Sequence, residues 1–371
     1  MCGNFGLLLL LPIERPAILT LLRRMLRVTM VRGAQSAGLV TYEKKQHGAT
    51  GLRCRVVNGK RTDLADLLLE KFSSALSARA SARLYQGHTR FATSSICNLG
   101  GCHPHQWLPP NLQNAWRFAD GIFVAERCNV ESYITHNGDL DFFTVHGITY
   151  ALSDVQRLLS KLLGRPMPSD VDSACVAGLL DLLRTQGLWL ASVRYGYLFG
   201  ALEGAGGLGE RIDRLASAAQ LSILASVFEA EWESVLRSRD TAATWLSERS
   251  RNAGESHASD AHASDLEFGR ESECARRLRL IGVHRQQMIS CMLRRLSEVD
   301  TAESALPLPG LSHRAAALHR LVETAVQAFF HADLLRAGVE LMAGAHGSFG
   351  LVLSHSLDAE RDVVIAARGQ T

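Results

Sequence analysis

An apolar run at the very start of the chain limits what its N-terminus can form. Residues 5–11 read Phe-Gly-Leu-Leu-Leu-Leu-Leu, and Pro12 closes the run. An uninterrupted apolar run of this length is typical of a buried strand and is far shorter than the ~20 residues of a membrane span. Cys2 stands just before the run. The sequence therefore predicts a cysteine held at the mouth of a core strand and not on a frayed tail.

Cys2 also follows Met1 directly. Because cysteine is small, removal of Met1 is expected and would leave a residue with both a thiol and a free α-amine. A free α-amine has a pKa of ~8 and a thiol one of ~8.5, so near neutral pH part of the amine can take the thiol proton, directly or through one water. Acyl transfer at a carbon–nitrogen bond needs such a nucleophile and base. The alternative for this residue alone is an ordinary terminal cysteine.

Composition excludes several classes of protein. The 371 residues suffice for one large or two modest domains, and 47% hydrophobic with 21% charged residues is typical of a soluble globular protein. A net charge of +3 is too small to indicate a nucleic-acid surface. Eight cysteines without a secretory signal favour reduced thiols and a cytoplasmic location. We expect neither a nucleic-acid nor a membrane partner.

Hydrophobic periodicity predicts the main elements. Helices are expected over residues 18–26, 64–72, 224–246, 276–296 and 318–329, with a further helical run after Ser173 through Leu179 and Leu183. Strands are expected over 5–11, 39–42, 53–57 and 84–93, and a strand with a turn over 130–143.

The strand that begins at Leu84 ends in a polar cluster. Arg90 stands there with Thr89 and Thr93 as hydroxyl neighbours. A guanidinium fork suits a carboxylate ligand, so we interpret Arg90 as a candidate substrate clamp, with a plain surface cation as the alternative.

Thiol and imidazole groups gather shortly after this strand, at Cys97, Cys102, His103 and His105. These are zinc ligands by type. No second C-x-x-C and no distant H-x3-H pair completes a tetrahedral set, so we predict packed or hydrogen-bonded histidines and no metal site.

Two polar motifs further along have both a structural and a functional interpretation. Asn137-Gly138 is a common hairpin turn. Its side-chain amide and the glycine N–H are alternatively two neutral donors that could converge on a developing oxyanion. Asp170 and Asp172 precede a helical run, and either could cap the helix. The sequence pattern does not decide which of them faces a pocket.

Taken in order, these motifs resemble the class II glutamine amidotransferase domain, the N-terminal nucleophile (Ntn) glutaminase found in glucosamine-6-phosphate synthase and amidophosphoribosyltransferase. The motifs are Met1-Cys2-Gly3, Arg32-Gly33-x-Gln35-Ser36-Ala37-Gly38, Gly87-His88-Thr89-Arg90-Phe91-Ala92-Thr93, His103-Pro104-His105, His136-Asn137-Gly138-Asp139 and Asp172-Ser173.

The resemblance implies an α+β fold, the four-layer αββα Ntn-hydrolase sandwich, with a glutaminase core over 1–185 and closing strands over 344–371. It implies hydrolysis of L-glutamine to glutamate and ammonia through a Cys2 thioester, without a cofactor. The roles implied are an oxyanion hole from Asn137 and Gly138, binding of the substrate by Arg90, Thr93, Asp172 and His103, and a place beside the nucleophile for Arg32 and Gly33. Asn4, Ser94 and Ala174 depart from the family pattern.

Residues 186–343 lie outside the resemblance and are expected to form a helical insertion with a disordered linker near 250–266. This linker holds His-Ala-Ser-Asp twice, from His257 and from His262, for which a solvated segment is favoured over a metal tract. The chain ends before any acceptor domain, so an ammonia-accepting synthase domain or subunit is expected elsewhere. The sequence is either a fragment or a free-standing glutaminase. The alternative functions are a catalytically silent glutamine-binding or scaffold domain, or an Ntn amidohydrolase of another amide.

Overall fold

The computed structural model describes residues 2–11, 13–58, 63–76, 82–91, 98–201, 208–254, 272–300 and 315–369. Helices and strands both contribute, and the strand pairs within its sheets are antiparallel. This mixed architecture agrees with the α+β class predicted from the sequence.

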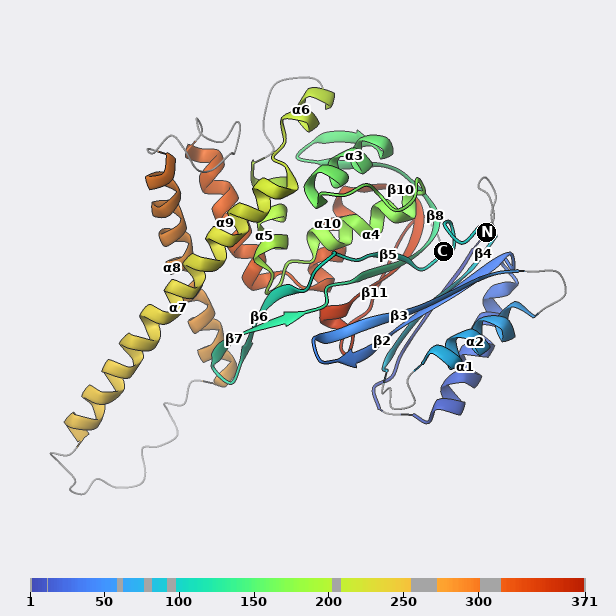
Figure 1. The fold of residues 1–371 in the computed structure, drawn as a ribbon, viewed down its shortest axis with the longest axis horizontal. Coiled ribbons are helices and arrows are strands. Elements are labelled where there is room, and N and C mark those ends of the chain that lie inside the picture. The colour runs from blue at the N-terminus through green and yellow to red at the C-terminus, as the bar shows by residue number, and fades with distance from the viewer. Residues whose placement is uncertain are drawn as a thin grey trace.

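The first sheet has the strand order β1-β4-β2-β3. Its strands are β1 (Gly3–Leu8), β4 (Leu84–Arg90), β2 (Ser36–Lys45) and β3 (Gly48–Val57). Helices α1 (Arg15–Met30) and α2 (Leu64–Ala75) cover one face of it (Figure 1). Each helix turns an apolar stripe to the sheet, with Leu22 and Leu26 of α1 and Leu68 and Phe72 of α2 all fully buried. Both helices agree with the periodicity.

The second sheet has the order β11-β10-β8-β5, and β9 also pairs with β8. Its strands are β11 (Val364–Arg368), β10 (Ala345–His355), β8 (Ser132–Val145), β5 (His105–Trp107) and β9 (Ile148–Ala151). Helices α3 (Leu152–Leu163), α4 (Asp172–Leu183) and α10 (Leu334–Gly344) pack against its outer face (Figure 1). A separate hairpin consists of β6 (Gln113–Ala119) and β7 (Ile122–Cys128).

The inner faces of the two sheets meet along a polar seam. Tyr42 and Ser354 share a hydrogen bond of 3.0 Å between their hydroxyls, and Gln86 Nε2 donates to the Val352 carbonyl at 2.6 Å. Side chains alternate along a strand, so Gln86 places the other even-numbered residues of β4, including Arg90, on the same inner face. The seam runs along β4 to Thr89, which pairs with Gly3, the first residue of β1, and Cys2 lies just before that residue.

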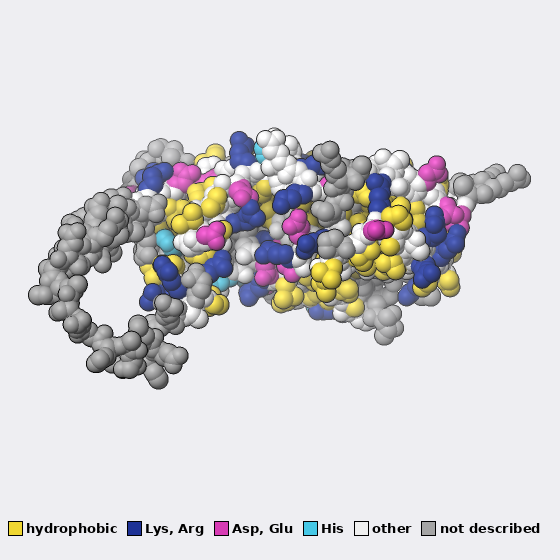
Figure 2. All heavy atoms as spheres, turned by 90° about the horizontal axis from the view of Figure 1, so that it is seen from below, with side chains coloured by type: hydrophobic (Ala, Val, Ile, Leu, Met, Phe, Trp, Pro, Cys, Tyr) yellow, Lys and Arg dark blue, Asp and Glu magenta, His cyan; other side chains and the backbone are white. Residues whose placement is uncertain are grey.

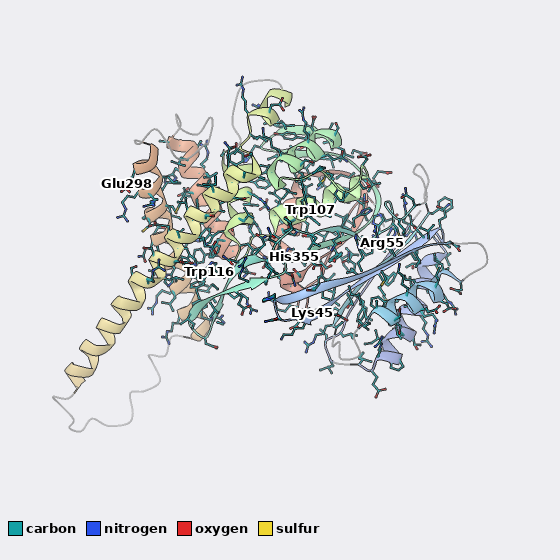
Figure 3. The ribbon with its side chains drawn as sticks, viewed as in Figure 1. Lys45, Arg55, Trp107, Trp116, Glu298 and His355 are labelled. Atoms are coloured by element: carbon teal, nitrogen blue, oxygen red, sulfur yellow. The ribbon has the colours of Figure 1, made fainter. Side chains whose placement is uncertain are left out.

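The described part of residues 186–343 is helical. It comprises α5 (Trp189–Gly196), the π-helical turn η1 (Tyr197–Ala201), α6 (Leu208–Arg214), α7 (Ala218–Gly254), α8 (Glu273–Asp300), α9 (Ala315–His331) and α10. Trp189 of α5 stacks on Phe329 of α9 with ring centroids 3.8 Å apart, and the core that they share continues into α4 and β8. Trp116, which Figure 3 labels on the β6–β7 hairpin, meets Trp232 of α7 edge-on.

One end of α7 extends away from the body (Figure 1). This helix continues to Gly254, so the disordered linker predicted near 250–266 is wrong for residues 250–254. The remainder of that linker, including both His-Ala-Ser-Asp copies, lies outside the described residues.

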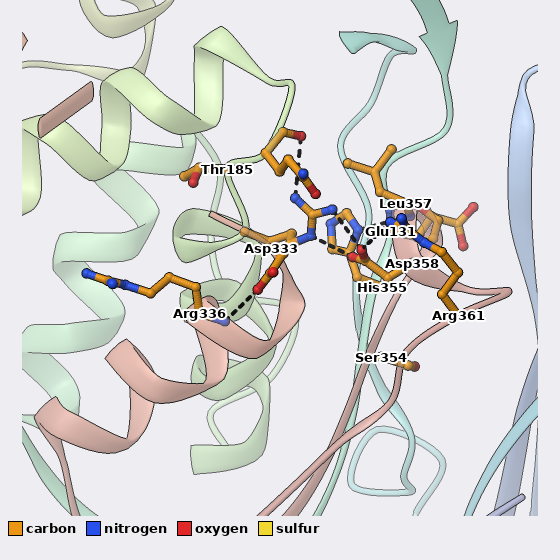
Figure 4. A network of polar contacts seen from close by, with 12 residues as sticks. Glu131, Thr185, Asp333, Arg336, Ser354, His355, Leu357, Asp358 and Arg361 are labelled. Carbon is orange, nitrogen blue, oxygen red and sulfur yellow. Dashed lines mark hydrogen bonds and ion pairs between the residues drawn. The ribbon is translucent and has the colours of Figure 1, made fainter. Parts of the chain in front are cut away.

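A buried ion pair ties the end of α4 to the turn after β10. Arg184 donates from Nε at 2.6 Å and from Nη2 at 2.9 Å to the two oxygens of Asp358, and both side chains are almost completely buried (Figure 4). In the same turn the Ser356 hydroxyl accepts from the Glu131 N–H at 2.9 Å. These contacts fix the start of β8 against the end of β10.

Two local predictions were wrong. The first strand ends at Leu8 and not at Leu11, because Leu8 pairs with Leu84, the first residue of β4, and Leu10 and Leu11 are 82% and 75% exposed. The hairpin turn considered at residues 137–138 is absent, since these residues lie inside β8. The turn is at His146-Gly147, with φ of +48° and +73°, between β8 and β9.

Charged side chains of both signs are interspersed over the face shown in Figure 2. In the described part of the chain, no helix combines the length and the apolar character needed to cross a bilayer.

Candidate active site

Cys2 lies at the open end of β1 and contacts the other sheet. Its backbone nitrogen donates to Asn137 Oδ1 at 3.1 Å, and its thiol lies 3.7 Å from the Phe91 carbonyl oxygen. Antiparallel pairing of Gly3 with Thr89 sets this position, because it brings the first residues of β1 beside the last residues of β4. Cys2 is half-buried. The predicted nucleophile and one predicted oxyanion-hole residue are therefore in direct contact.

Asn137 faces the first sheet from the middle of the second. On β8 it pairs with Gly350 of β10, and the carbonyl of Gly350 accepts a hydrogen bond of 3.0 Å from Asn4 Nδ2. Asn4 lies two residues after Cys2, and both bond the second sheet, Asn4 through its side chain and Cys2 through its backbone nitrogen. Sequence reasoning noticed Asn4 only as a departure from a family pattern. A lone polar residue beside an apolar run was the available signal of a cross-sheet contact.

Gly138 follows Asn137 in a backbone conformation that requires glycine. Its φ is +109°, outside the range that other residues adopt without strain. A β-carbon there would overlap the Ser348 carbonyl oxygen and lie 2.8 Å from Phe349 Cα. Glycine thus allows β8 and β10 to approach closely next to Asn137.

Arg90 and Gly33 lie on either side of the Phe91 backbone. Arg90 is only 6% exposed, and its guanidinium lies against the backbone of Gly101. The α-carbon of Gly33 packs so closely on this segment that a β-carbon would lie 2.6 Å from the Phe91 nitrogen. The Phe91 carbonyl also contacts the Cys2 thiol, so Gly33 packs on the segment that contacts the predicted nucleophile, whereas the Arg90 guanidinium lies at Gly101.

Asp172, the first residue of α4, binds backbone groups of the strand that carries Asn137. Its carboxylate accepts from the Leu140 N–H at 3.2 Å and from the Ser173 N–H at 2.7 Å, and it lies 3.5 Å from His136 Nδ1. Burial acts to raise the pKa of Asp172, but the His136 contact and these N–H donors outweigh it and lower the pKa to about 2. Asp170 is exposed. Of the two aspartates, Asp172 is thus the one that the fold turns inward and keeps ionised.

Four buried histidines lie behind these residues. His103 stacks on His88 with centroids 4.1 Å apart and meets His105 edge-on at 4.5 Å. The backbone N–H of His136 donates to His103 Nδ1 at 3.2 Å, so Nδ1 of His103 carries no proton. Burial is the main reason that the pKa of His88 and of His105 falls to about 3 and that of His103 well below its ordinary value.

Neutral rings suit this cluster, because they can pack together without charge repulsion. Within the described residues, no group of three or more histidine, cysteine or carboxylate side chains has the geometry of a metal site. Cys102 is buried, and Cys97 lies outside the described residues.

Two predicted site residues remain. Thr93 lies outside the described residues, and Arg32 is exposed on the turn after α1. His136 and Ser173 were not singled out as separate site residues, yet they join Asp172 to the histidine cluster through a contact of 3.0 Å between His136 Nδ1 and Ser173 Oγ. His136 lies in β8 and Ser173 at the start of α4, and in the sequence each stood out only as part of a longer motif.

The arrangement brings together a half-buried thiol, a backbone nitrogen, an amide side chain and an ionised carboxylate. These groups can supply a nucleophile, hydrogen-bond donors for a carbonyl oxygen, and a partner for a cationic group on a ligand. No protein-family model matches the sequence, and no curated protein is significantly similar to it.

Proposed function

We propose that this chain is a glutamine amidotransferase domain that hydrolyses the side-chain amide of L-glutamine to glutamate and ammonia, with Cys2 as N-terminal nucleophile. The observation that supports this most is the 3.1 Å hydrogen bond from the Cys2 nitrogen to Asn137 Oδ1. It joins the two groups that the chemistry needs, from segments that are far apart in the sequence.

The first step depends on the removal of Met1, which turns the Cys2 nitrogen into a free amine. The amine can keep one N–H on Asn137 Oδ1 and take the thiol proton with its lone pair. The sulfur then attacks the side-chain carbonyl carbon of glutamine, and its oxygen becomes an oxyanion. Asn137 Nδ2 and the Gly138 N–H stabilise that charge, a contribution worth about 10²–10³ in rate for one donor.

The second half returns the proton to the leaving group. The protonated amine donates to the nitrogen as the carbon–nitrogen bond breaks, so that ammonia leaves and a Cys2 thioester remains. Water then attacks the thioester, with the amine again accepting a proton, and releases glutamate and the free thiol. An acceptor domain or subunit outside this sequence would use the ammonia.

Substrate selection rests on two charged residues. The Arg90 guanidinium binds the α-carboxylate of glutamine, since a planar fork matches a carboxylate. Asp172 binds the α-ammonium group, and its low pKa keeps it ionised for that role. Substrates that lack these two groups would not be held over Cys2.

The fold supports the same proposal. The layers run from α1 and α2 through the β1 sheet and the β8 sheet to α3, α4 and α10 (Figure 1). We propose that this order is the four-layer αββα sandwich of Ntn hydrolases, with residues 186–343 as a helical addition that packs into the same core.

Covalent labelling with a diazo-ketone analogue of glutamine tests the proposal. After incubation of the purified chain, the adduct should lie on a peptide that begins at Cys2, and L-glutamine should protect it. The Cys2→Ala variant should take up no label there. Cys274→Ala is the matched control, because Cys274 is exposed on α8 and its loss should leave labelling unchanged. Labelling that is insensitive to glutamine, or an N-terminal peptide that keeps Met1, would refute the proposed mechanism.

Steady-state kinetics separate glutamine from another amide as substrate. Arg90→Gln should raise the KM for glutamine, whereas an amidohydrolase of a different amide would not need this side chain. Asn137→Ala should lower kcat about 10²–10³-fold. Asn114→Ala is a control for the loss of an amide, because Asn114 only bonds Glu229 at the surface.

A further inference from the structure

A pocket separate from Cys2 lies where the edges of the two sheets meet. Its volume is about 310 Å³, and it is lined by β3, β5 and the turn between α3 and α4. β3 and β5 are the last strands of their sheets in the order of pairing, so this corner is open on the strand side. None of Cys2, Asn137 and Asp172 lines it.

Three arginines converge on this pocket: Arg53, Arg55 and Arg165. Arg53 and Arg55 are two residues apart on β3, so strand alternation turns both to the same side, while Cys54 between them is buried on the other. Arg165 comes from the turn after α3, and its guanidinium lies 4.0 Å over the ring of the buried Trp107, which Figure 3 labels.

The contacts of these arginines leave N–H groups for a ligand. Arg53 donates from Nη1 to the Pro104 carbonyl at 3.2 Å, and Arg55 donates from Nη1 to the carbonyls of Leu99 and Cys102 at 2.7 and 3.1 Å. A guanidinium has five N–H donors, so Nε and Nη2 of both residues are not used in these bonds. A guanidinium stacked on an aromatic ring likewise keeps its donors at its edge.

The positive charge of the pocket is not neutralised by ion pairs within the described chain, where none involves these three arginines. Glu131 acts electrostatically on Arg53 and Asp181 on Arg165, but neither forms an ion pair with them within the described residues. Glu131 accepts from the Tyr133 hydroxyl at 2.7 Å, and Asp181 pairs with Arg194 at 3.9 Å. Like charges held together without a counter-ion repel one another, and a bound anion would relieve that repulsion.

An unpaired buried nitrogen in a residue of the pocket wall is a second indication that the pocket binds a ligand. His105 lines the pocket and is 3% exposed, and its Nε2 has no hydrogen-bond partner in the described part of the structure. Buried polar atoms are normally paired. Leu108 and Pro166 supply an apolar wall beside these polar groups.

We propose that this pocket binds a small phosphate ester, with the phosphate held by Arg53, Arg55 and Arg165. Three guanidiniums match a dianionic, tetrahedral group better than a single carboxylate, because arginine binds phosphate through two parallel N–H bonds. The pocket is at the lower end of the range for small-molecule sites, which limits the ester to a compact metabolite. The inference is independent of the chemistry proposed for Cys2.

Titration calorimetry on the full chain at low ionic strength tests this site. The probes are inorganic phosphate, glycerol 3-phosphate as a small ester, and succinate as a dicarboxylate of similar charge. We expect saturable binding of both phosphates, with the ester tighter than inorganic phosphate and succinate weaker than either. Raising the salt concentration should weaken binding, since the attraction is electrostatic.

Two variants locate the binding, and two further variants serve as controls. Arg53→Gln and Arg165→Gln should each weaken ester binding about tenfold or more, the effect expected when a charge-assisted hydrogen bond is lost. Arg165→Lys keeps the charge and should bind with intermediate affinity. Arg24→Gln removes an exposed cation on α1 and should change the affinity less than about twofold.

Three results would overturn the proposal. The first is no saturable heat with either phosphate, and the second is an equal loss of affinity in Arg24→Gln and Arg165→Gln. The third is succinate binding as tight as that of the ester, which would identify a carboxylate site. Thermal unfolding without ligand verifies that each variant is folded.

Discussion

Replacing Gly138 with alanine should destabilise the protein far more than replacing Gly350, although the two glycines lie on paired strands one step apart in register. At Gly138 the φ of +109° costs an alanine about 1–3 kcal/mol. The new β-carbon would also overlap the Ser348 carbonyl and approach Phe349 Cα to 2.8 Å, which adds about 1–3 kcal/mol for displaced backbone. At Gly350 a β-carbon meets nothing within 4 Å. Gly350→Ala should therefore stay within about 1 kcal/mol of the wild type.

Urea unfolding followed by circular dichroism measures this difference. With a slope of about 3 kcal/mol per molar urea, a loss of 2–6 kcal/mol lowers the midpoint of Gly138→Ala by about 0.7–2 M. The midpoint of Gly350→Ala should move by about 0.3 M or less. Equal midpoints for the two variants would refute the argument that close approach of β8 and β10 requires glycine at 138.

Two further predictions concern charge in the interior. His88 and His105 have a pKa of about 3 in the folded chain, mainly because they are buried, against about 6.5 when unfolded. The unfolded state therefore binds more protons between these values, so stability is complete above about pH 6.5 and falls toward pH 3 by up to ~1.4 kcal/mol per pH unit for each ring. Unfolding free energies from urea titrations between pH 7 and pH 4 should fall with this slope. The double variant His88→Asn, His105→Asn should show a shallower pH dependence. Identical slopes would contradict the assignment of low pKa values to these two histidines. Asp358→Asn should cost about 3–5 kcal/mol, because it leaves Arg184 buried without a carboxylate, whereas a joint change to Arg184→Met and Asp358→Leu should restore most of that loss. Asp66→Asn, which breaks the exposed ion pair of Asp66 with Arg23, is the control. If Asp358→Asn lowered the thermal midpoint no more than Asp66→Asn, the Arg184–Asp358 pair would be unimportant for stability.

Periodicity predicted those elements whose own residues carry the signal. The helices α1, α2 and α9 have apolar positions at helical spacing, and each was placed within a few residues of its bounds. The late pair of β10 and β11 was expected on other grounds, from the resemblance to a known domain family. In the three helices, local pattern and tertiary burial agree.

Prediction failed where a distant segment decides the conformation. Asn137-Gly138 has the composition of a hairpin turn, yet pairing with Phe349 and Gly350 of β10 keeps it extended within β8. The choice between Asp170 and Asp172 depends on the Leu140 N–H, which no local pattern reveals. The pocket with Arg53 and Arg165 forms between the edges of two different sheets, so neither segment indicates it alone.

The position of β1 accounts for how the first described residues of the chain are held between the two sheets. β1 is an edge strand of its sheet, whereas β8 and β10 lie inside theirs. Two hydrogen bonds cross between the sheets here, from the Cys2 nitrogen to Asn137 and from Asn4 Nδ2 to the Gly350 carbonyl. Their donors belong to residues two apart in the chain, and their acceptors belong to residues that face each other across β8 and β10.

Only the second of these bonds uses a side chain, because Cys2 donates from its backbone nitrogen. Asn4 anchors the chain two residues beyond the proposed nucleophile, and loss of Met1 would remove neither bond. A leucine at position 4 would keep the apolar character of the strand but lose the second bond, so Asn4→Leu should reduce labelling of Cys2 while leaving the fold intact. If labelling of this variant equalled that of the wild type, the hydrogen bond to Asn137 alone would suffice to position Cys2.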